Sequence, residues 1–157
     1  MNGFKASEIL EIAMRIEENG QKLYRHAATL TGDSATKDVF AFLANEEAKH
    51  KTTFQGMLSK IEKYQPPESY PGEYFAYLRA YAEGIVFPPD RMEKELTNIT
   101  DVESAVEFGV QREVESILYY LEVRNLVPEH QRAEIDRIAD EERSHYLKLT
   151  DLKRGLQ

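Results

Sequence analysis

The segment Asn45-Glu46-Glu47-Ala48-Lys49-His50 and the later segment Asp140-Glu141-Glu142-Arg143-Ser144-His145 share one arrangement, a glutamate followed three residues later by a histidine. Both segments lie within long stretches whose apolar residues recur with helical spacing. On an α-helix, positions i and i+3 lie about 60° apart around the axis and ~4.5 Å apart along it. The carboxylate and the imidazole therefore converge on one point beside the helix, where a single cation can bind.

The apolar spacing predicts four long helices, at about residues 7–30, 34–64, 101–125 and 129–154. Ser7, Asp33 and Asp101 are suitable N-caps, and the pair Pro66-Pro67 ends the second helix. Residues 65–100 form an unusually long connection that carries six aromatic residues, which argues against a disordered linker. We predict one short helix in it, at about 73–83, within a crossover packed along the outside of the other helices.

Four long helices with two short joins and a long crossover between helices 2 and 3 are typical of an all-α, ferritin-like four-helix bundle. The length of 157 residues fits a single domain over 1–157. A role of the aromatic crossover as a dimer contact or as a lid over a site is an alternative to simple packing.

Two further glutamates, Glu17 and Glu113, each interrupt an apolar stripe on the helix that precedes a Glu-x-x-His segment. A shift of 96 residues takes Glu17 to Glu113, and a shift of 95 takes the first Glu-x-x-His pair to the second. The chain is therefore an internal repeat of two helix pairs. A glutamate in an apolar stripe is costly unless something pairs with it.

Four inward carboxylates and two imidazoles form the ligand set that suits a pair of divalent cations, because four negative charges balance four positive ones. The predicted metal ligands are Glu17, Glu47, His50, Glu113, Glu142 and His145. By geometry Glu47 and Glu142 would bridge the two metals, while Glu17 and Glu113 would be terminal ligands.

A single Glu-x-x-His segment is usually a solvated helix face, and the position of all six residues in apolar stripes is what favours the metal site. The neighbours Glu18, Glu46 and Glu141 point about 100° away from the chosen ligands, toward solvent or partner helices. His26 and His130 are interpreted as surface residues.

Tyr24 and Tyr120 each follow a lone glutamate by seven residues, and their side chains lean toward the helix N-terminus and hence toward the metal layer. They are candidate catalytic residues that hydrogen-bond the ligands. The alternative is that both are ordinary core aromatic residues.

The composition excludes several classes of function. Twenty-eight acidic and 20 basic residues give a net charge of −8, which argues against nucleic acid and an anionic membrane as partners. The absence of cysteine excludes disulfides, iron–sulfur clusters and thiol nucleophiles within this sequence. No apolar run approaches the ~18 residues of a membrane span, and we expect a soluble, cytoplasmic protein.

The combined motif resembles the rubrerythrin branch of the ferritin-like superfamily over nearly the whole chain. The likeness is carried by Ala13-x3-Glu17-x2-Gly20-x3-Tyr24, Glu47-Ala48-Lys49-His50, Glu113-x6-Tyr120 and Glu142-Arg143-Ser144-His145. The resemblance implies a non-haem centre of two iron ions, a homodimer, and reaction with hydrogen peroxide or dioxygen. It also implies that the tyrosines at positions 24 and 120 lie beside the ligands.

Two departures from the family pattern affect the expected function. Rubrerythrins with a rubredoxin domain bind an iron with four cysteines, and this sequence has none, so we expect an external electron donor such as a rubredoxin-like protein. Rubrerythrins also carry an extra glutamate three residues after the third-helix ligand, where this sequence has Ser116.

Three functions compete at this point. The first is a di-iron redox protein that reduces hydrogen peroxide, the second a ferroxidase or iron-handling protein, and the third a metal-free helical scaffold. Iron is the metal that the resemblance implies. Manganese satisfies the same ligands, and zinc can replace either during purification.

Overall fold

The computed structural model describes residues 5–61 and 72–156. Within these residues, helices are the regular secondary structure, and turns and loops connect them. The helices are α1 (Ala6–Ala28), α2 (Ser34–Leu58), α3 (Gly72–Ile85), α4 (Pro89–Asn98), α5 (Val102–Val123) and α6 (Arg132–Gly155). A short 3-10 helix, Glu129–Gln131, precedes α6. The predicted all-α fold with four long helices is confirmed.

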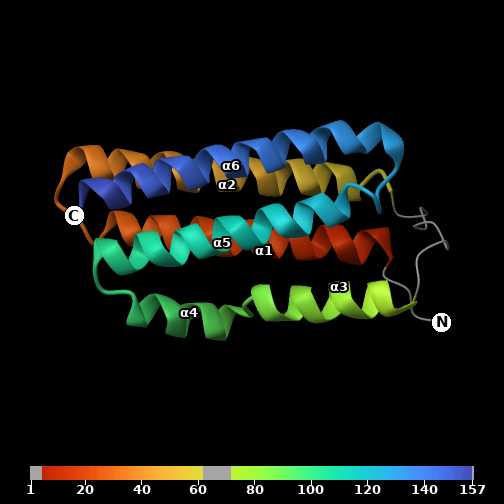
Figure 1. Ribbon diagram of the computed structural model, residues 1–157, viewed down its shortest axis with the longest axis horizontal. Helices are drawn as coiled ribbons and strands as arrows, with labels where there is room; N and C mark the ends of the chain where they lie inside the picture. Colours follow the sequence, from red (N-terminus) through yellow and green to blue (C-terminus); the bar gives the residue numbers. More distant parts are fainter. Residues whose placement is uncertain (1–4, 62–71, 157) are drawn as a thin grey trace.

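The four long helices form two antiparallel pairs, α1 with α2 and α5 with α6 (Figure 1). The pairs pack on each other through α1 and α5 and through α2 and α6. Helices α3 and α4 lie nearly end to end along the outside of the bundle, on the side of α1 and α5 (Figure 1). This arrangement is the predicted bundle with a long external crossover.

Two of the three predicted N-caps, Asp33 and Asp101, are confirmed. The Asp33 carboxylate accepts from the Thr36 backbone N–H at 2.9 Å, and the Asp101 carboxylate accepts from that of Ser104 at 2.7 Å. The third was wrong, because α1 begins at Ala6 and its N-cap is Lys5. The Glu8 carboxylate accepts from the Lys5 backbone N–H at 2.9 Å, which fixes the earlier start.

The second helix ends earlier than predicted. Helix α2 ends at Leu58, where the Ser59 hydroxyl donates to the Gly56 carbonyl at 2.7 Å and a turn follows. Residues 62–64 of the predicted helix, and 65–71 of the predicted crossover, lie outside the described residues.

The crossover holds two helices rather than the one predicted. The predicted helix at about 73–83 lies within α3, and a second helix, α4, follows with Pro89 in its first turn. Proline suits that position because the first backbone N–H groups of a helix have no intrahelical partner.

The core is divided into two apolar clusters along the length of the bundle. Ile9 of α1 and Phe54 of α2 belong to one cluster, while Leu23 and Phe40 of the same helices belong to the other. The polar residues of the repeat lie between these positions on each helix. The fold therefore places a buried polar layer near its middle, with a hydrophobic cluster on each side.

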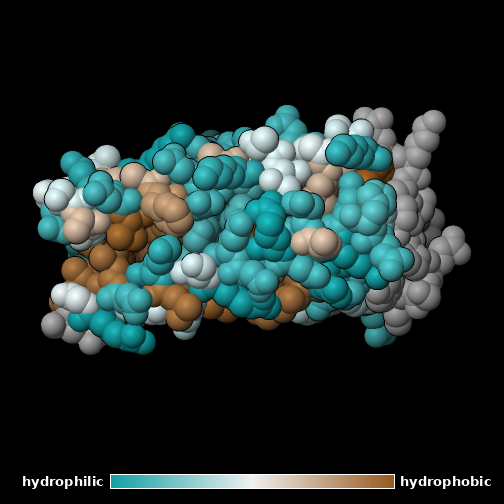
Figure 2. All heavy atoms as spheres, turned by 90° about the horizontal axis from the view of Figure 1, so that it is seen from above, coloured by the Kyte–Doolittle hydropathy of each residue, from teal (hydrophilic) through white to brown (hydrophobic). Residues whose placement is uncertain are grey.

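The surface over α2 and α6 is mainly hydrophilic, with hydrophobic side chains gathered toward the end where the C-terminus lies (Figure 2). None of the helices within residues 5–61 and 72–156 combines the length and the apolar character that crossing a bilayer demands.

Candidate metal centre

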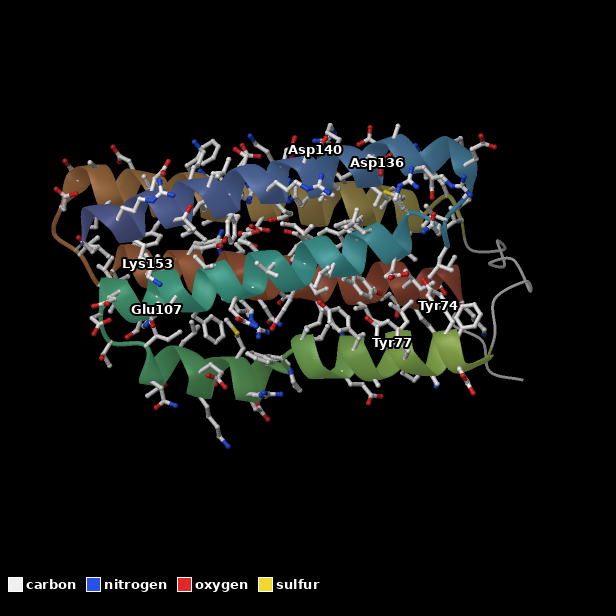
Figure 3. The ribbon with its side chains drawn as sticks, in the orientation of Figure 1. Tyr74, Tyr77, Glu107, Asp136, Asp140 and Lys153 are labelled. Carbon is white, nitrogen blue, oxygen red and sulfur yellow. The ribbon has the colours of Figure 1, made fainter. Side chains whose placement is uncertain are left out.

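The six predicted ligands come together in the polar layer, one from each of α1 and α5 and two from each of α2 and α6. All six are buried, and the most exposed of them retains 4% of its accessible surface: Glu17, Glu47, His50, Glu113, Glu142 and His145. Figure 3 shows oxygen- and nitrogen-bearing side chains in the interior between the two helix pairs. Burial of six ionisable groups in one layer requires that they neutralise one another or bind a charge.

The first half of the cluster is centred on Nδ1 of His50. This nitrogen lies 2.9 Å from Glu142 Oε1 and 3.4 Å from Glu17 Oε2, while Glu47 Oε2 is 3.8 Å away. One ligand atom from each of these four residues lies within 4.8 Å of the others. The spacing allows one cation to contact all four.

The second half is centred on Nδ1 of His145. This nitrogen lies 3.1 Å from Glu142 Oε2 and 3.2 Å from Glu47 Oε1, while Glu113 Oε1 is 3.7 Å away. One ligand atom from each of these four residues again lies within 4.8 Å of the others. Glu47 and Glu142 thus belong to both halves, and each directs one oxygen to each histidine.

The two imidazole rings lie parallel to each other across the cluster, with centroids 5.6 Å apart and planes 19° apart. The two halves are therefore adjacent sites related by the sequence repeat.

Tyr24 on α1 and Tyr120 on α5 each form a hydrogen bond to a glutamate on the other of these two helices. The Tyr24 hydroxyl donates to Glu113 Oε1 at 2.5 Å, and the Tyr120 hydroxyl donates to Glu17 Oε1 at 2.5 Å. Gly109 makes room for the first contact, since a Cβ there would lie 3.3 Å from Tyr24 Cε1. Each tyrosine thus hydrogen-bonds the lone glutamate of the other half.

Small residues also keep space beside the shared carboxylates. A Cβ on Gly20 would lie 3.3 Å from both Cγ and Cδ of Glu47. A larger residue at this position would displace a carboxylate that contacts both histidines.

The cluster fits a pair of divalent cations because two of its own buried carboxylate oxygens have no hydrogen-bond partner among the described residues. These atoms are Glu17 Oε2 and Glu113 Oε2, whose companion oxygens are bonded by the two tyrosines. An unpaired buried carboxylate oxygen is strongly destabilising. Both atoms belong to the four-residue groups described above, so a cation in each group would satisfy them.

Without metal, protons balance the charge of the cluster. Burial, followed by the charges of Glu142 and Glu47, raises the pKa of Glu17 and of Glu113 well above the ordinary value of 4.5. Burial and the Glu142 charge also act to raise the pKa of Glu47, but its close contacts with Glu17 and the histidines outweigh them and lower it.

Glu142 follows the same pattern as Glu47. Burial opposes its ionisation, but hydrogen bonds with Glu113, His145 and His50 lower its pKa well below 4.5. These shifts favour the ionised form of the two shared carboxylates and the protonated form of the two terminal ones.

The histidines also hold protons in the metal-free cluster. Burial acts to lower the pKa of His145, but hydrogen bonds to Glu113, Glu142 and Glu47 raise it from 6.5 to about 12. Burial and carboxylate contacts act in the same directions on His50, whose pKa is raised far above 6.5. Two imidazolium groups thus balance two carboxylates, and the cluster is neutral.

The structure places one of the three neighbouring glutamates away from this cluster and two at its outer edge. Glu18 pairs with Lys22 at 3.6 Å and faces away, as predicted. Glu46 pairs with Lys49 at 3.6 Å, and one of its carboxylate oxygens lies within 4.8 Å of a His50 ring nitrogen and of a Glu141 oxygen. Glu141 contacts a predicted ligand, because its Oε2 lies 2.5 Å from His50 Nε2. The sequence predicted that these side chains point toward solvent or partner helices, and the contact with His50 was not predicted.

The remaining histidines lie outside the cluster. His130 is exposed in the 3-10 helix, as predicted. His26 is partly exposed and lies outside the cluster, and its Nε2 donates to the Ile99 carbonyl at 2.8 Å, a contact that the sequence did not predict.

Replacing Tyr24 or Tyr120 with phenylalanine is expected to destabilise the metal-loaded protein by about 1.5–3 kcal/mol, the usual contribution of a hydrogen bond to a charged group. Urea denaturation measures the loss. The matched control is Tyr77→Phe, since the Tyr77 side chain is 56% exposed and its change should stay within about 0.5 kcal/mol. Equal stability in all three variants would contradict the role given to the buried hydroxyls.

A family model described as Rubrerythrin matches residues 8–153. Among solved structures, a candidate ferritin-like diiron-carboxylate protein from Thermotoga maritima superposes with a TM-score of 0.73 at 24% identity, covering 100% of this chain and 99% of that one. A hypothetical protein from Pyrococcus furiosus gives a TM-score of 0.69 at 23% identity, covering 96% of this chain and 89% of that one. At these identities the likeness shows the fold. The comparison with curated proteins gives no match.

Proposed function

The chain belongs to the rubrerythrin family, and from this premise we propose that it is a non-haem di-iron redox protein that reduces hydrogen peroxide, or dioxygen, with electrons from an external donor. The observation that carries the proposal is the buried cluster of four glutamates and two histidines with two unpaired carboxylate oxygens. Two iron ions bound there would supply the two electrons that cleave the O–O bond of peroxide.

Each residue of the cluster has a distinct task in this proposal. Glu47 and Glu142 would hold both metals, because each turns one oxygen to each half of the cluster. His50 and His145 would each supply one imidazole ligand, and Nδ1 is the nitrogen that faces the carboxylates. Glu17 and Glu113 complete the two halves with the oxygens that lack hydrogen-bond partners.

The tyrosines keep the terminal carboxylates in place and retain their own protons. Burial, followed by the charge of Glu113, raises the pKa of Tyr24 well above its ordinary value of 10.0. Burial and the charge of Glu17 do the same for Tyr120. Both phenols therefore remain hydrogen-bond donors at neutral pH, and each leaves one carboxylate oxygen free to bind metal.

A small cavity between α1 and α5 supports the proposal that the oxidant is a small molecule such as hydrogen peroxide or dioxygen. Its volume is about 20 Å³, and Gly20, Tyr24, Glu47, Glu113 and Ser116 are among the residues that line it. This volume holds roughly one water-sized molecule. Hydrogen peroxide and dioxygen are of this size class, and a bulky organic substrate is not.

Ser116 contributes a neutral hydroxyl to the cavity wall at the position where rubrerythrins carry a further glutamate. Its hydroxyl donates to the Arg112 carbonyl at 2.8 Å, as expected for a serine that bonds back along its own helix. Tyr24 also lines the cavity, and its hydroxyl donates to the proposed ligand Glu113.

Peroxide consumption by the iron-loaded protein, with reduced rubredoxin as the donor, tests the proposal. We expect catalytic turnover that is lost in Glu47→Ala and retained in Glu46→Ala, whose side chain faces Lys49. Oxidation of ferrous iron without peroxide turnover, followed by uptake of further iron, would replace this function with iron handling. A protein that takes up no metal would return the scaffold interpretation.

A further inference from the structure

The two histidines of the cluster have different surroundings on their outer sides. Nε2 of His50 lies 2.5 Å from Glu141 Oε2 on α6. For His145, no hydrogen bond within residues 5–61 and 72–156 reaches Nε2. Its ring instead meets the edge of Phe42 on α2, with centroids 6.3 Å apart and planes 85° apart.

This difference arises where the sequence repeat is broken. The shift of 95 residues that relates the two Glu-x-x-His pairs takes Glu46 to Glu141 and Phe42 to Arg137. Arg137 Nη1 donates to Glu141 Oε1 at 2.7 Å and so leaves Oε2 of that carboxylate for His50. Its counterpart Phe42 has no donor to offer Glu46, which pairs with Lys49.

Arg137 is itself held in place from the preceding turn. Its Nη2 donates to Glu134 Oε2 at 2.9 Å. Glu134, Arg137 and Glu141 therefore form one row along α6, and the row ends on His50. Asp140, in the same turn as Glu141, lies on the outer side of the helix (Figure 3). The row lies at the edge of the buried layer, where its members remain partly exposed.

A carboxylate on the outer nitrogen of a metal-binding histidine has known physical consequences. It fixes the tautomer so that the outer nitrogen carries the proton and the inner one presents its lone pair, and it raises the basicity of the ring. Loss of such a partner typically costs 10–100-fold in metal affinity. His145 is oriented by packing against Phe42, which supplies no negative charge.

We propose that Glu141, held by Arg137, is a positioning residue for His50 and makes the two metal positions unequal. The position formed by Glu17, Glu47, His50 and Glu142 binds a divalent cation more tightly and fills first. The position formed by Glu47, Glu113, Glu142 and His145 fills second. This inference rests on the proposed metal centre and does not depend on its reaction with oxidant.

The outer residues could also be taken for a metal site of their own, because Glu46, His50 and Glu141 bring one ligand atom each within 4.8 Å. The ion pairs of Glu46 with Lys49 and of Glu141 with Arg137 favour the positioning role instead, since each already satisfies one carboxylate. The two roles differ in stoichiometry and in the effect of changing Glu46.

Anaerobic titration of the metal-free protein with cobalt(II), followed by visible absorption and by competition with a chelator, tests the inference. We expect two steps in the wild type, with dissociation constants about 10–100-fold apart. Glu141→Gln should weaken the tight step by about that factor and leave the weak step unchanged. Glu141→Asp should restore part of the difference, and Arg137→Gln should reduce it.

The matched control is Glu46→Gln, the repeat counterpart of Glu141→Gln, which should leave both steps unchanged. Circular dichroism should show that both metal-free variants remain folded at the temperature of the titration, so that the lost affinity does not reflect unfolding. Two equal steps in the wild type, or an unchanged tight step in Glu141→Gln, would overturn this inference alone. A third cobalt ion lost in Glu46→Gln would replace it with an outer site. No cobalt uptake by the wild type would overturn the proposed centre together with this inference.

Discussion

Replacement of Glu47 or Glu142 by alanine is expected to lower the affinity of the chain for divalent metal by more than 100-fold. Each carboxylate directs one oxygen to each histidine, so its loss removes a ligand from both metal positions at once. Loss of a partner that only orients a ligand already costs 10–100-fold. The loss of a shared ligand should therefore exceed that range.

Chelator competition measures the affinities, with Glu46→Ala and Glu18→Ala as matched controls. These side chains are one position away in the sequence and pair with lysines outside the cluster. Both controls should bind metal as the wild type does. Undiminished binding by Glu47→Ala and Glu142→Ala would show that the metal lies elsewhere.

The metal-free protein is expected to lose stability as the pH rises, and bound metal should remove this dependence. The pKa of Glu17 and of Glu113 is raised on folding, so the folded state keeps protons that the unfolded state releases above about 4.5. The contribution of these groups is present below that pH and is lost as the pH rises toward their folded values. Each retained proton corresponds to a slope of up to about 1.4 kcal/mol per pH unit.

The histidines extend the same trend to higher pH. Their folded pKa values are raised, so their contribution is complete below 6.5 and is lost as the pH rises toward about 12 for His145. Glu47 and Glu142 act oppositely, since their lowered pKa values give a contribution that is lost only on acidification below about 4.5. The net expectation is a decline in the stability of the metal-free protein between about pH 5 and 9.

Metal reverses this behaviour because it replaces the protons. Glu17, Glu113, His50 and His145 each release one proton when two cations bind, and titration in weak buffer should detect about four protons per chain. At a free metal concentration 1,000 times the dissociation constant, the gain is about 4.1 kcal/mol for each metal position, equivalent to a rise in melting temperature of roughly 8–16 °C per position.

Urea denaturation of metal-free and metal-loaded protein across the pH range measures both effects. A metal-free stability that is constant from pH 5 to 9, with no protons released on loading, would contradict the charge balance inferred for the cluster.

The buried carboxylates of the cluster could be predicted because three signals agree on them. Glu17, Glu47, Glu113 and Glu142 lie in apolar stripes, they recur at shifts of 96 and 95 residues, and two of them precede a histidine by about one helical turn. The structure buries all four in one layer. Helix period and repeat thus specify which residues face inward, and burial follows from the bundle.

The partner of each tyrosine could not be predicted in the same way. The spacing places Tyr24 on the face of Glu17, yet its hydroxyl bonds Glu113 on the neighbouring helix. Which of two inward glutamates it reaches depends on the relative shift and rotation of α1 and α5. A helical pattern within one chain segment carries no information on either.

Two other features could not be predicted from the sequence: the contact of Glu141 with His50, and the helix α4. The spacing of Arg137 and Glu141 marks an i,i+4 ion pair, but only the packing of α2 on α6 brings His50 to that carboxylate. Helix α4 was missed because consecutive prolines end one helix and can also begin the next. The direction of the chain after Pro89 decides between these, and it depends on packing against the bundle.

Anaerobic titration of the metal-free protein with ferrous iron tests the central claim most directly. A saturable uptake that ends at two iron ions per chain is the result expected from two four-residue groups sharing Glu47 and Glu142. An absence of saturable uptake would contradict the di-iron centre.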